Sequence, residues 1–269
     1  MRNPSFRGNV VIITGASSGI GRELAYLMAS EGARLALAAR NERELETVAE
    51  RCRQRGAQAL AVPTDVAEPE QCRRLIEDTV GQFGRIDTLV NNAGISMWAR
   101  FEEFKDLAPL ERIMRVNFLG SLYCTHYALP HLKKTRGRIV GVASLTGKVG
   151  VPTRSVYCAS KHAMAGFYDS LRIEEAPQGV SVTMVYPGFV ESAVRHRAVG
   201  ADGNPMGRNP LKAEKMMSAE TCARVILKAA AQRKREVVMT FRGKVSQWLK
   251  LFSPRLVDYF ARKAIEKGS

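Results

Sequence analysis

Two side chains in the middle of the chain could move a proton. Tyr157 and Lys161 lie four residues apart in a segment with a helical pattern, and a helix places residues at that spacing on one face. The pKa of a free tyrosine is about 10, and a neighbouring ammonium lowers it because it stabilises the phenolate. Such a hydroxyl could exchange a proton with a carbonyl oxygen. The same spacing occurs on ordinary amphipathic helices, so the pair needs support from other residues.

Two further polar residues could serve the same reaction. Ser144 ends a predicted strand thirteen residues before Tyr157, and its hydroxyl could stabilise charge that develops on a reacting oxygen. The alternative is that Ser144 caps the turn after that strand. Asn117 lies inside a helical pattern, where asparagine is mildly unfavourable, although it could be an ordinary polar helix position. The predicted catalytic residues are therefore Asn117, Ser144, Tyr157 and Lys161.

A glycine-rich loop follows the first predicted strand. It reads Thr14-Gly15-Ala16-Ser17-Ser18-Gly19-Ile20-Gly21, and a helical pattern begins at its end. Glycines allow a tight turn and a close approach of the backbone to a pyrophosphate, and the N-terminus of a helix offers free N–H groups. A plain strand-to-helix turn is the alternative, but the position of the loop predicts nucleotide binding.

The end of the second predicted strand favours one cofactor over another. In dinucleotide-binding folds an acidic residue at this point binds the ribose 2′-hydroxyl of NAD, and a basic residue accommodates the 2′-phosphate of NADP. Here Ala39 stands at the candidate acidic position, and Arg40 and Asn41 follow it. The sequence therefore predicts NADP(H) rather than NAD(H), unless Arg40 merely begins a solvated helix with Arg43.

Short apolar runs alternate with longer amphipathic stretches. The strands and helices that they form must position the catalytic and cofactor-binding residues. Runs of this length with little alternation are typical of strands covered on both faces, and strand–helix alternation indicates a parallel, doubly wound sheet. The sequence thus predicts an α/β fold with a single Rossmann-type sheet of about seven strands and helices on both faces. The expected strands are Val10–Thr14, Arg34–Ala39, Ala59–Pro63, Thr88–Asn91, Arg138–Ala143, Ser181–Tyr186 and Glu236–Thr240. The clearest helices are Arg22–Ser30, Glu42–Arg55, Pro69–Phe83, Leu110–Lys133, Ser155–Glu175 and Ala219–Gln232.

In these motifs the chain resembles the short-chain dehydrogenase/reductase family, and the resemblance extends over about two-thirds of the sequence. The matching residues lie in the family's order, and the full set is far more specific than any one of them. They are Thr14-Gly15-x3-Gly19-Ile20-Gly21, Asp65-Val66, Asn91-Asn92-Ala93-Gly94, Asn117, Ser144, Tyr157-Cys158-Ala159-Ser160-Lys161 and Pro187-Gly188.

The resemblance implies further roles. Lys161 would hold the hydroxyls of the nicotinamide ribose, Asn117 would bind a water that relays protons to it, and Asp65 would contact the adenine ring. Ser192 stands where the family often has threonine and could bind the carboxamide. Dimers or tetramers of identical chains are implied as well. The predicted cofactor-binding residues are Gly15, Ser17, Ser18, Gly19, Ile20, Gly21, Arg40, Asn41, Asp65, Val66, Asn91, Ala93, Gly94, Tyr157, Lys161, Pro187, Gly188, Val190 and Ser192.

The substrate is less clearly indicated by the sequence. Residues 191–217 lack periodicity and follow the sixth strand, so they are expected to form a substrate loop at the carboxyl edge of the sheet. Apolar residues of this loop and of the segment after the fourth strand could wall a pocket for a lipid-, steroid- or aromatic-like compound. Ordinary core packing is the alternative. The residues are Ile95, Ser96, Met97, Trp98, Phe101, Phe104, Met206, Met216 and Met217.

The net charge of +15 is concentrated near the C-terminus. From Arg195 onward there are 17 Lys and Arg against six Asp and Glu. Residues 242–267 interleave basic and aromatic side chains, which suits an anionic membrane surface, while Pro254 is expected to break or restart a helix. The favoured alternative is a helix pair that packs on the substrate pocket or on another subunit. The chain also resembles members of the family that act on hydrophobic substrates, such as the 11-beta-hydroxysteroid type, in having a C-terminal extension. Nucleic-acid binding is not predicted.

One catalytic domain, residues 1–241, and a basic amphipathic extension, residues 242–269, are the expected organisation. Five cysteines without CxxC spacing and four scattered histidines predict neither disulfides nor a metal site. A cytoplasmic protein is expected because no apolar run has the length of a spanning helix or a signal peptide, and peripheral membrane contact through residues 242–267 is one of the open alternatives. The predicted function is an NADP(H)-dependent oxidoreductase that acts on a carbonyl or secondary alcohol. The alternative is a non-catalytic NADP(H)-sensing protein.

Overall fold

Seven parallel strands form one sheet at the centre of the chain. The computed structural model describes residues 6–191, 197–207 and 216–266. The strand order is β3-β2-β1-β4-β5-β6-β7, which reverses direction between β1 and β4. This order confirms the predicted doubly wound sheet and places a crevice at the switch point, where such folds bind ligands. The strands are β1 (Val10–Thr14), β2 (Arg34–Ala39), β3 (Ala59–Pro63), β4 (Thr88–Asn91), β5 (Arg138–Val142), β6 (Ser181–Tyr186) and β7 (Glu236–Val238).

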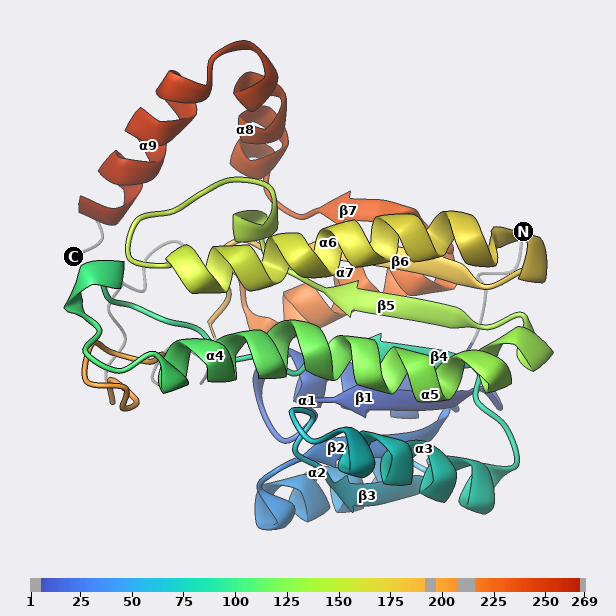
Figure 1. Ribbon diagram of the computed structural model, residues 1–269. Coiled ribbons are helices and arrows are strands. Elements are labelled where there is room, and N and C mark those ends of the chain that lie inside the picture. The colour runs from blue at the N-terminus through green and yellow to red at the C-terminus, as the bar shows by residue number, and fades with distance from the viewer. Residues whose placement is uncertain (1–5, 192–196, 208–215, 267–269) are drawn as a thin grey trace.

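Helices cover both faces of the sheet. Successive strand residues point to opposite faces, so Val10 and Ile12 belong to one core cluster and Val11 and Ile13 to the other. The first cluster contains the apolar faces of α3, α5 and α6, and the second contains those of α1, α2 and α7 (Figure 1). These helices are α1 (Gly19–Ser30), α2 (Glu42–Gln54), α3 (Pro69–Phe83), α5 (Gly120–Thr135), α6 (Ser155–Glu175) and α7 (Ala219–Ala231).

The predicted helix Leu110–Lys133 is interrupted. It consists of α4 (Ala108–Met114), a π-helical turn at Arg115–Leu119 and α5. A π turn adds one residue to the helical repeat without breaking the apolar pattern, and such turns are frequent at functional sites. This turn contains Asn117, so the local irregularity coincides with a predicted catalytic residue.

Other boundaries differ by a few residues for local reasons. Helix α1 begins at Gly19, which brings Ile20 and Gly21 into its first turn. Strand β7 ends at Val238, before the predicted Thr240, because the Thr240 hydroxyl accepts a hydrogen bond from the N–H of Gly243 at 3.1 Å and caps the next helix.

Two helices follow the sheet and project beyond its β7 edge (Figure 1). They are α8 (Phe241–Phe252) and α9 (Pro254–Glu266), and Pro254 starts the second helix as the sequence predicted. The two helices pack on each other in a hairpin. Within the described residues, none of the helices has the length and apolar character needed to cross a membrane.

Candidate active site

The glycine loop is shaped for a close ligand. Gly15 and Gly19 have φ angles of 66° and 54°, a region that favours glycine over other residues. A Cβ atom at Gly21 would lie 2.3 Å from the carbonyl oxygen of Gly15, so no side chain fits there without a backbone shift. Ser18 is the N-cap residue of α1, and its side chain accepts no hydrogen bond from the N–H groups of the first turn. The loop therefore leaves the N-terminus of α1 open to an anion such as a pyrophosphate.

Two neighbouring side chains hold this loop against β4. The Thr14 hydroxyl accepts hydrogen bonds from the N–H groups of Asn92 and Ala93, each at 3.0 Å. The side-chain amide of Asn92 donates to the carbonyl oxygens of Thr14 at 2.9 Å and Gly15 at 3.2 Å. Asn92 was noted in the motif but not predicted as a site residue, although it fixes the conformation of the loop.

Tyr157 and Lys161 lie one turn apart on α6, as their spacing predicted. The Lys161 Nζ is 5.9 Å from the centroid of the Tyr157 ring and donates a hydrogen bond to the Val142 carbonyl at 3.1 Å. Lys161 is 3% exposed, and burial lowers the pKa of its ammonium to about 8. The ammonium therefore stands close to the phenol in a poorly solvated place, where its charge acts strongly.

Ser144 stands where β5 ends and the short helix Leu145–Gly147 begins. Its Oγ accepts a hydrogen bond from the N–H of Thr146 at 3.3 Å. The capping role is thus observed, and the catalytic role of Ser144 stays a prediction. Because the oxygen accepts that bond, its hydroxyl hydrogen is still available to a reacting oxygen.

Asn117 is fully buried beneath the loop that follows β4. Its Oδ1 accepts from the N–H of Ile95 at 2.8 Å, and its Nδ2 donates to the Ile95 carbonyl at 3.0 Å and to the Ser160 hydroxyl at 2.9 Å. The side chain thus holds the loop in place and links it to α6. Ser160 was quoted only as part of the family motif, and its hydroxyl joins Asn117 to the helix of Tyr157.

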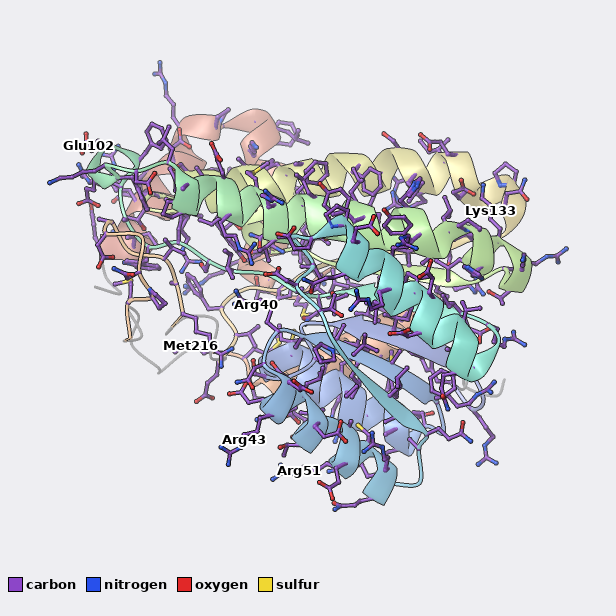
Figure 2. All side chains as sticks on the ribbon, turned by 60° about the horizontal axis from the view of Figure 1, so that its bottom comes forward. Arg40, Arg43, Arg51, Glu102, Lys133 and Met216 are labelled. Atoms are coloured by element: carbon purple, nitrogen blue, oxygen red, sulfur yellow. The ribbon has the colours of Figure 1, made fainter. Side chains whose placement is uncertain are left out.

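A single cavity of about 1690 Å³ joins the glycine loop to Tyr157. Figure 2 shows Arg40 and Met216, which both line it, on the same side of the molecule, whereas Lys133 lies at the far end. The predicted residues that line the cavity are Gly15, Ser17, Ser18, Gly19, Ile20, Arg40, Asn41, Asp65, Val66, Ala93, Gly94, Ser144, Tyr157, Pro187, Gly188 and Val190.

Four other predicted residues stand outside this lining. Gly21, Asn117 and Lys161 are buried directly behind it. Asn91 points into the helical layer instead, where its Nδ2 donates to the hydroxyls of Thr125 at 3.0 Å and Tyr168 at 2.6 Å. Its side chain therefore supports the packing of the sheet against the helices. Ser192 lies outside the described residues.

Charged residues mark the end of the cavity near β2 and β3. Arg112 forms an ion pair with Asp65, and the N–H of Ala67 donates to the same carboxylate at 3.0 Å. Burial opposes the charged form of Asp65, but these donors and the nearby Arg40 outweigh it and hold its pKa below the usual value. Asn41 caps α2 by accepting from the N–H of Glu44 at 3.2 Å.

The other end of the cavity is largely apolar. Of the predicted wall residues, Ile95, Ser96, Met216 and Met217 line it, whereas Met97, Trp98, Phe101, Phe104 and Met206 do not. Further walls come from segments that the sequence did not assign to the pocket, and from the helical hairpin, for which packing on the pocket was one of the predicted alternatives. These additional apolar residues are Leu145, Val149, Val151, Phe189, Leu249, Val257 and Phe260.

Comparisons with known proteins agree with this geometry. The 11-beta-hydroxysteroid dehydrogenase-like 4A of Arabidopsis thaliana is 42% identical over 251 residues, which cover 93% of this chain and 82% of the relative. The 11-beta-hydroxysteroid dehydrogenase A of Sesamum indicum is 39% identical over 264 residues, which cover 95% and 75% of the two chains.

Solved structures show the same fold. A short chain dehydrogenase/reductase from Burkholderia phymatum in complex with NAD superposes with a TM-score of 0.83 at 25% identity, covering 94% of this chain and 96% of the other. A dehydrogenase/reductase from Sinorhizobium meliloti 1021 gives 0.76 at 29% identity, covering 88% and 95%. The model of the short chain dehydrogenase family matches residues 9–202. The chain therefore belongs to the short-chain dehydrogenase/reductase family of oxidoreductases.

Proposed function

We propose that the protein is an NADP(H)-dependent oxidoreductase that interconverts a carbonyl compound and a secondary alcohol, with Tyr157 as general acid and base. The observation that carries the proposal is that Tyr157 and Ser144 line the same cavity as the glycine loop, with Lys161 one turn from Tyr157. A bound nicotinamide supplies or accepts the hydride.

Three side chains carry out the proton chemistry. In reduction, the Tyr157 hydroxyl donates its proton to the carbonyl oxygen while the Ser144 hydroxyl donates a hydrogen bond to it. The resulting phenolate is stabilised by the Lys161 ammonium. In oxidation the phenolate takes the proton back. Asn117 acts as a positioning residue through Ile95 and Ser160.

NADPH oxidation with a panel of ketones tests this proposal. Replacing Tyr157 by Phe removes the proton donor and keeps the ring, so kcat should fall by about 10²- to 10⁴-fold. The affinity for NADPH, measured by fluorescence titration, should change little. A folded protein that binds NADPH and reduces none of the ketones would favour the alternative, an NADP(H)-sensing protein without catalysis.

The preference for NADP(H) is part of the proposal and rests on Ala39 and Arg40. Arg40 is exposed at the end of β2 and lines the cavity, and no acidic side chain stands at position 39. A guanidinium there would bind the 2′-phosphate of NADP. The Burkholderia structure holds NAD, so the choice between cofactors needs its own test.

Substitution of Arg40 by Ser provides that test. A hydrogen bond to a charged group contributes about 1.5–3 kcal/mol, so kcat/KM for NADPH should fall roughly tenfold to a hundredfold while that for NADH stays the same. Arg43→Ser is the matched control because Arg43 is exposed on the next turn and lies outside the cavity. Equal losses in both variants would contradict a specific phosphate contact.

We further propose an apolar substrate of lipid-, steroid- or aromatic-like character. The apolar wall of the cavity supports this class, and the relatives named as 11-beta-hydroxysteroid dehydrogenases agree with it.

A cytoplasmic location is proposed, and the five cysteines, which are all free and buried, suit a reducing compartment. A homodimer or homotetramer remains a proposal taken from the family resemblance.

We also propose that the α8–α9 hairpin binds an anionic membrane surface. Trp248, Leu251 and Phe252 of the hairpin are exposed, and basic residues accompany them in its sequence. Aromatic and basic side chains in one amphipathic surface suit the boundary between lipid headgroups and acyl chains. The basic residues are Arg242, Lys244, Lys250, Arg255, Arg262 and Lys263.

A further inference from the structure

Arg154 brings a positive charge into the apolar end of the cavity. It precedes Tyr157 by three residues, lines the cavity and is only 7% exposed. Its guanidinium carbon lies 4.5 Å from the centroid of the Trp98 ring and 5.7 Å from that of Phe189. The ring faces attract the cation, but they offer no acceptor in the plane of its N–H groups.

Within the described part of the chain the guanidinium makes no hydrogen bond and no ion pair, and the polar groups that act on its charge are the Tyr157 hydroxyl and the Cys158 thiol. Arg112 and Arg172 are also partly buried, and each is paired with a carboxylate, Asp65 or Asp169. Arg154 has no such ion pair, and its Nε is buried without an acceptor. Burial lowers the pKa of Arg154, yet an arginine keeps its proton in proteins. A buried charge of this kind calls for an anion.

We propose that Arg154 binds an anionic group of the substrate, so that the enzyme acts on an oxo or hydroxy acid with an apolar body. This inference rests on the proposed function. The guanidinium carbon is 5.9 Å from the centroid of the Tyr157 ring. A carboxylate on Arg154 would therefore lie only a few bonds from the carbon that exchanges hydride, while the apolar body would occupy the wall of methionines and aromatic rings.

The anion belongs to the substrate because the cofactor's phosphates have a separate site. The glycine loop follows β1 and opens onto the N-terminus of α1, and Arg40 follows β2. Arg154 stands in the turn before α6, beyond β4 and β5 in the sheet order. A guanidinium also matches a carboxylate with two parallel hydrogen bonds, which makes Arg154 a specificity-determining residue.

Binding to the enzyme saturated with NADP⁺ tests the inference without turnover. Isothermal titration would compare phenylalkanoates of increasing chain length, and decanoate, with the amide of each acid. We expect at least one acid to bind roughly tenfold more tightly than its amide, which corresponds to about 1.4 kcal/mol. Arg154→Met should abolish that preference, and Arg154→Lys should keep part of it. Equal binding of every acid and its amide would overturn the inference.

The matched control is Arg100→Met, because Arg100 is highly exposed, pairs with Glu102 and lies outside the cavity. It should keep the preference for acids. Arg154→Gln serves as a second variant if the methionine form is unstable, and retained binding of NADP⁺ shows that either variant is folded. A preference for acids that persists in a folded Arg154 variant would also overturn the inference.

Turnover separates the inference from the proposed function. With NADPH, wild-type enzyme should reduce benzoylpropanoate with a lower KM than its methyl ester, and Arg154→Met should raise KM for the acid alone. Reduction of both compounds with equal KM would overturn the inference and leave the proposed function standing. Selective binding of acids without reduction of any ketone would support the anion site and contradict the proposed function.

Discussion

Lys161 holds a positive charge in an almost fully buried place. Its Nζ is bound to one backbone carbonyl, and burial lowers the pKa of the ammonium from 10.5 to about 8. The unfolded chain would bind that proton more strongly than the folded chain does. The proposed reaction needs this charge, but burying it is unfavourable. At any pH at which the folded and the unfolded chain both carry the proton, Lys161 should lower the free energy of unfolding.

Replacing Lys161 by Met should stabilise the protein and stop the reaction. Removing the buried ammonium relieves a folding penalty of about 3 kcal/mol, which corresponds to the shift of its pKa. Losing its hydrogen bond to the Val142 carbonyl costs about 1 kcal/mol. The free energy of unfolding in urea should thus rise by about 2 kcal/mol at about pH 7. Above pH 8 the folded state loses its proton first, so the advantage of the variant should shrink as the pH rises to about 10.

Lys234→Met is the control for this prediction because Lys234 is exposed. It should change the unfolding free energy by less than about 0.5 kcal/mol at either pH. A Lys161→Met variant that is less stable than wild type at neutral pH would show that the ammonium contributes more to the fold than its burial costs.

At the scale of elements, the join between β1 and α1 is the most constrained part of the site. The hypothetical Cβ of Gly21 meets backbone at Gly15 and the amide of Asn92, and neither can move without disturbing the loop. Gly21→Ala should therefore weaken NADPH binding by at least about tenfold and lower the melting temperature. Fluorescence titration and thermal unfolding measure the two effects.

Gly81→Ala is the control for Gly21→Ala, and we expect the opposite result from it. Gly81 lies in α3, and a Cβ there would meet nothing within 4 Å. Alanine in an exposed helix should stabilise the protein by up to about 1 kcal/mol and leave NADPH binding unchanged. If Gly21→Ala behaved like Gly81→Ala, the close approach at the glycine loop would not matter for the cofactor.

The sequence predicted the strands well because their apolar runs are buried on both faces. It could not predict the π turn at Asn117, since an added residue in the helix leaves the apolar pattern almost unchanged. Nor could it separate Asn91 from Asn92. The amide of Asn91 reaches the helices at Tyr168, whereas that of Asn92 reaches the glycine loop. A motif names both asparagines, and only the fold shows where each one points.

At the scale of the whole molecule, the cavity depends on segments far apart in the chain. Its apolar walls include Leu145 after β5, Met217 before α7, Leu249 in α8 and Val257 in α9. The sequence allowed the hairpin to pack on the pocket, to pack on another subunit or to bind a membrane. Its inner side lines the cavity, while its outer side exposes large apolar residues. The inner side therefore agrees with packing on the pocket, and lipid contact of the outer side stays a proposal.

Vesicle binding tests the outer side of the hairpin. The protein should sediment with vesicles containing about 30% phosphatidylserine at low ionic strength, because each basic residue near the surface adds about 1 kcal/mol of attraction. Binding should weaken in about 0.5 M salt, which screens these charges. The combined substitution of Trp248, Leu251 and Phe252 by Ser should abolish it. Ile173→Ser is the control, since Ile173 is equally exposed on α6. Failure to sediment at low salt, or full binding by the triple variant, would assign the hairpin to the pocket alone.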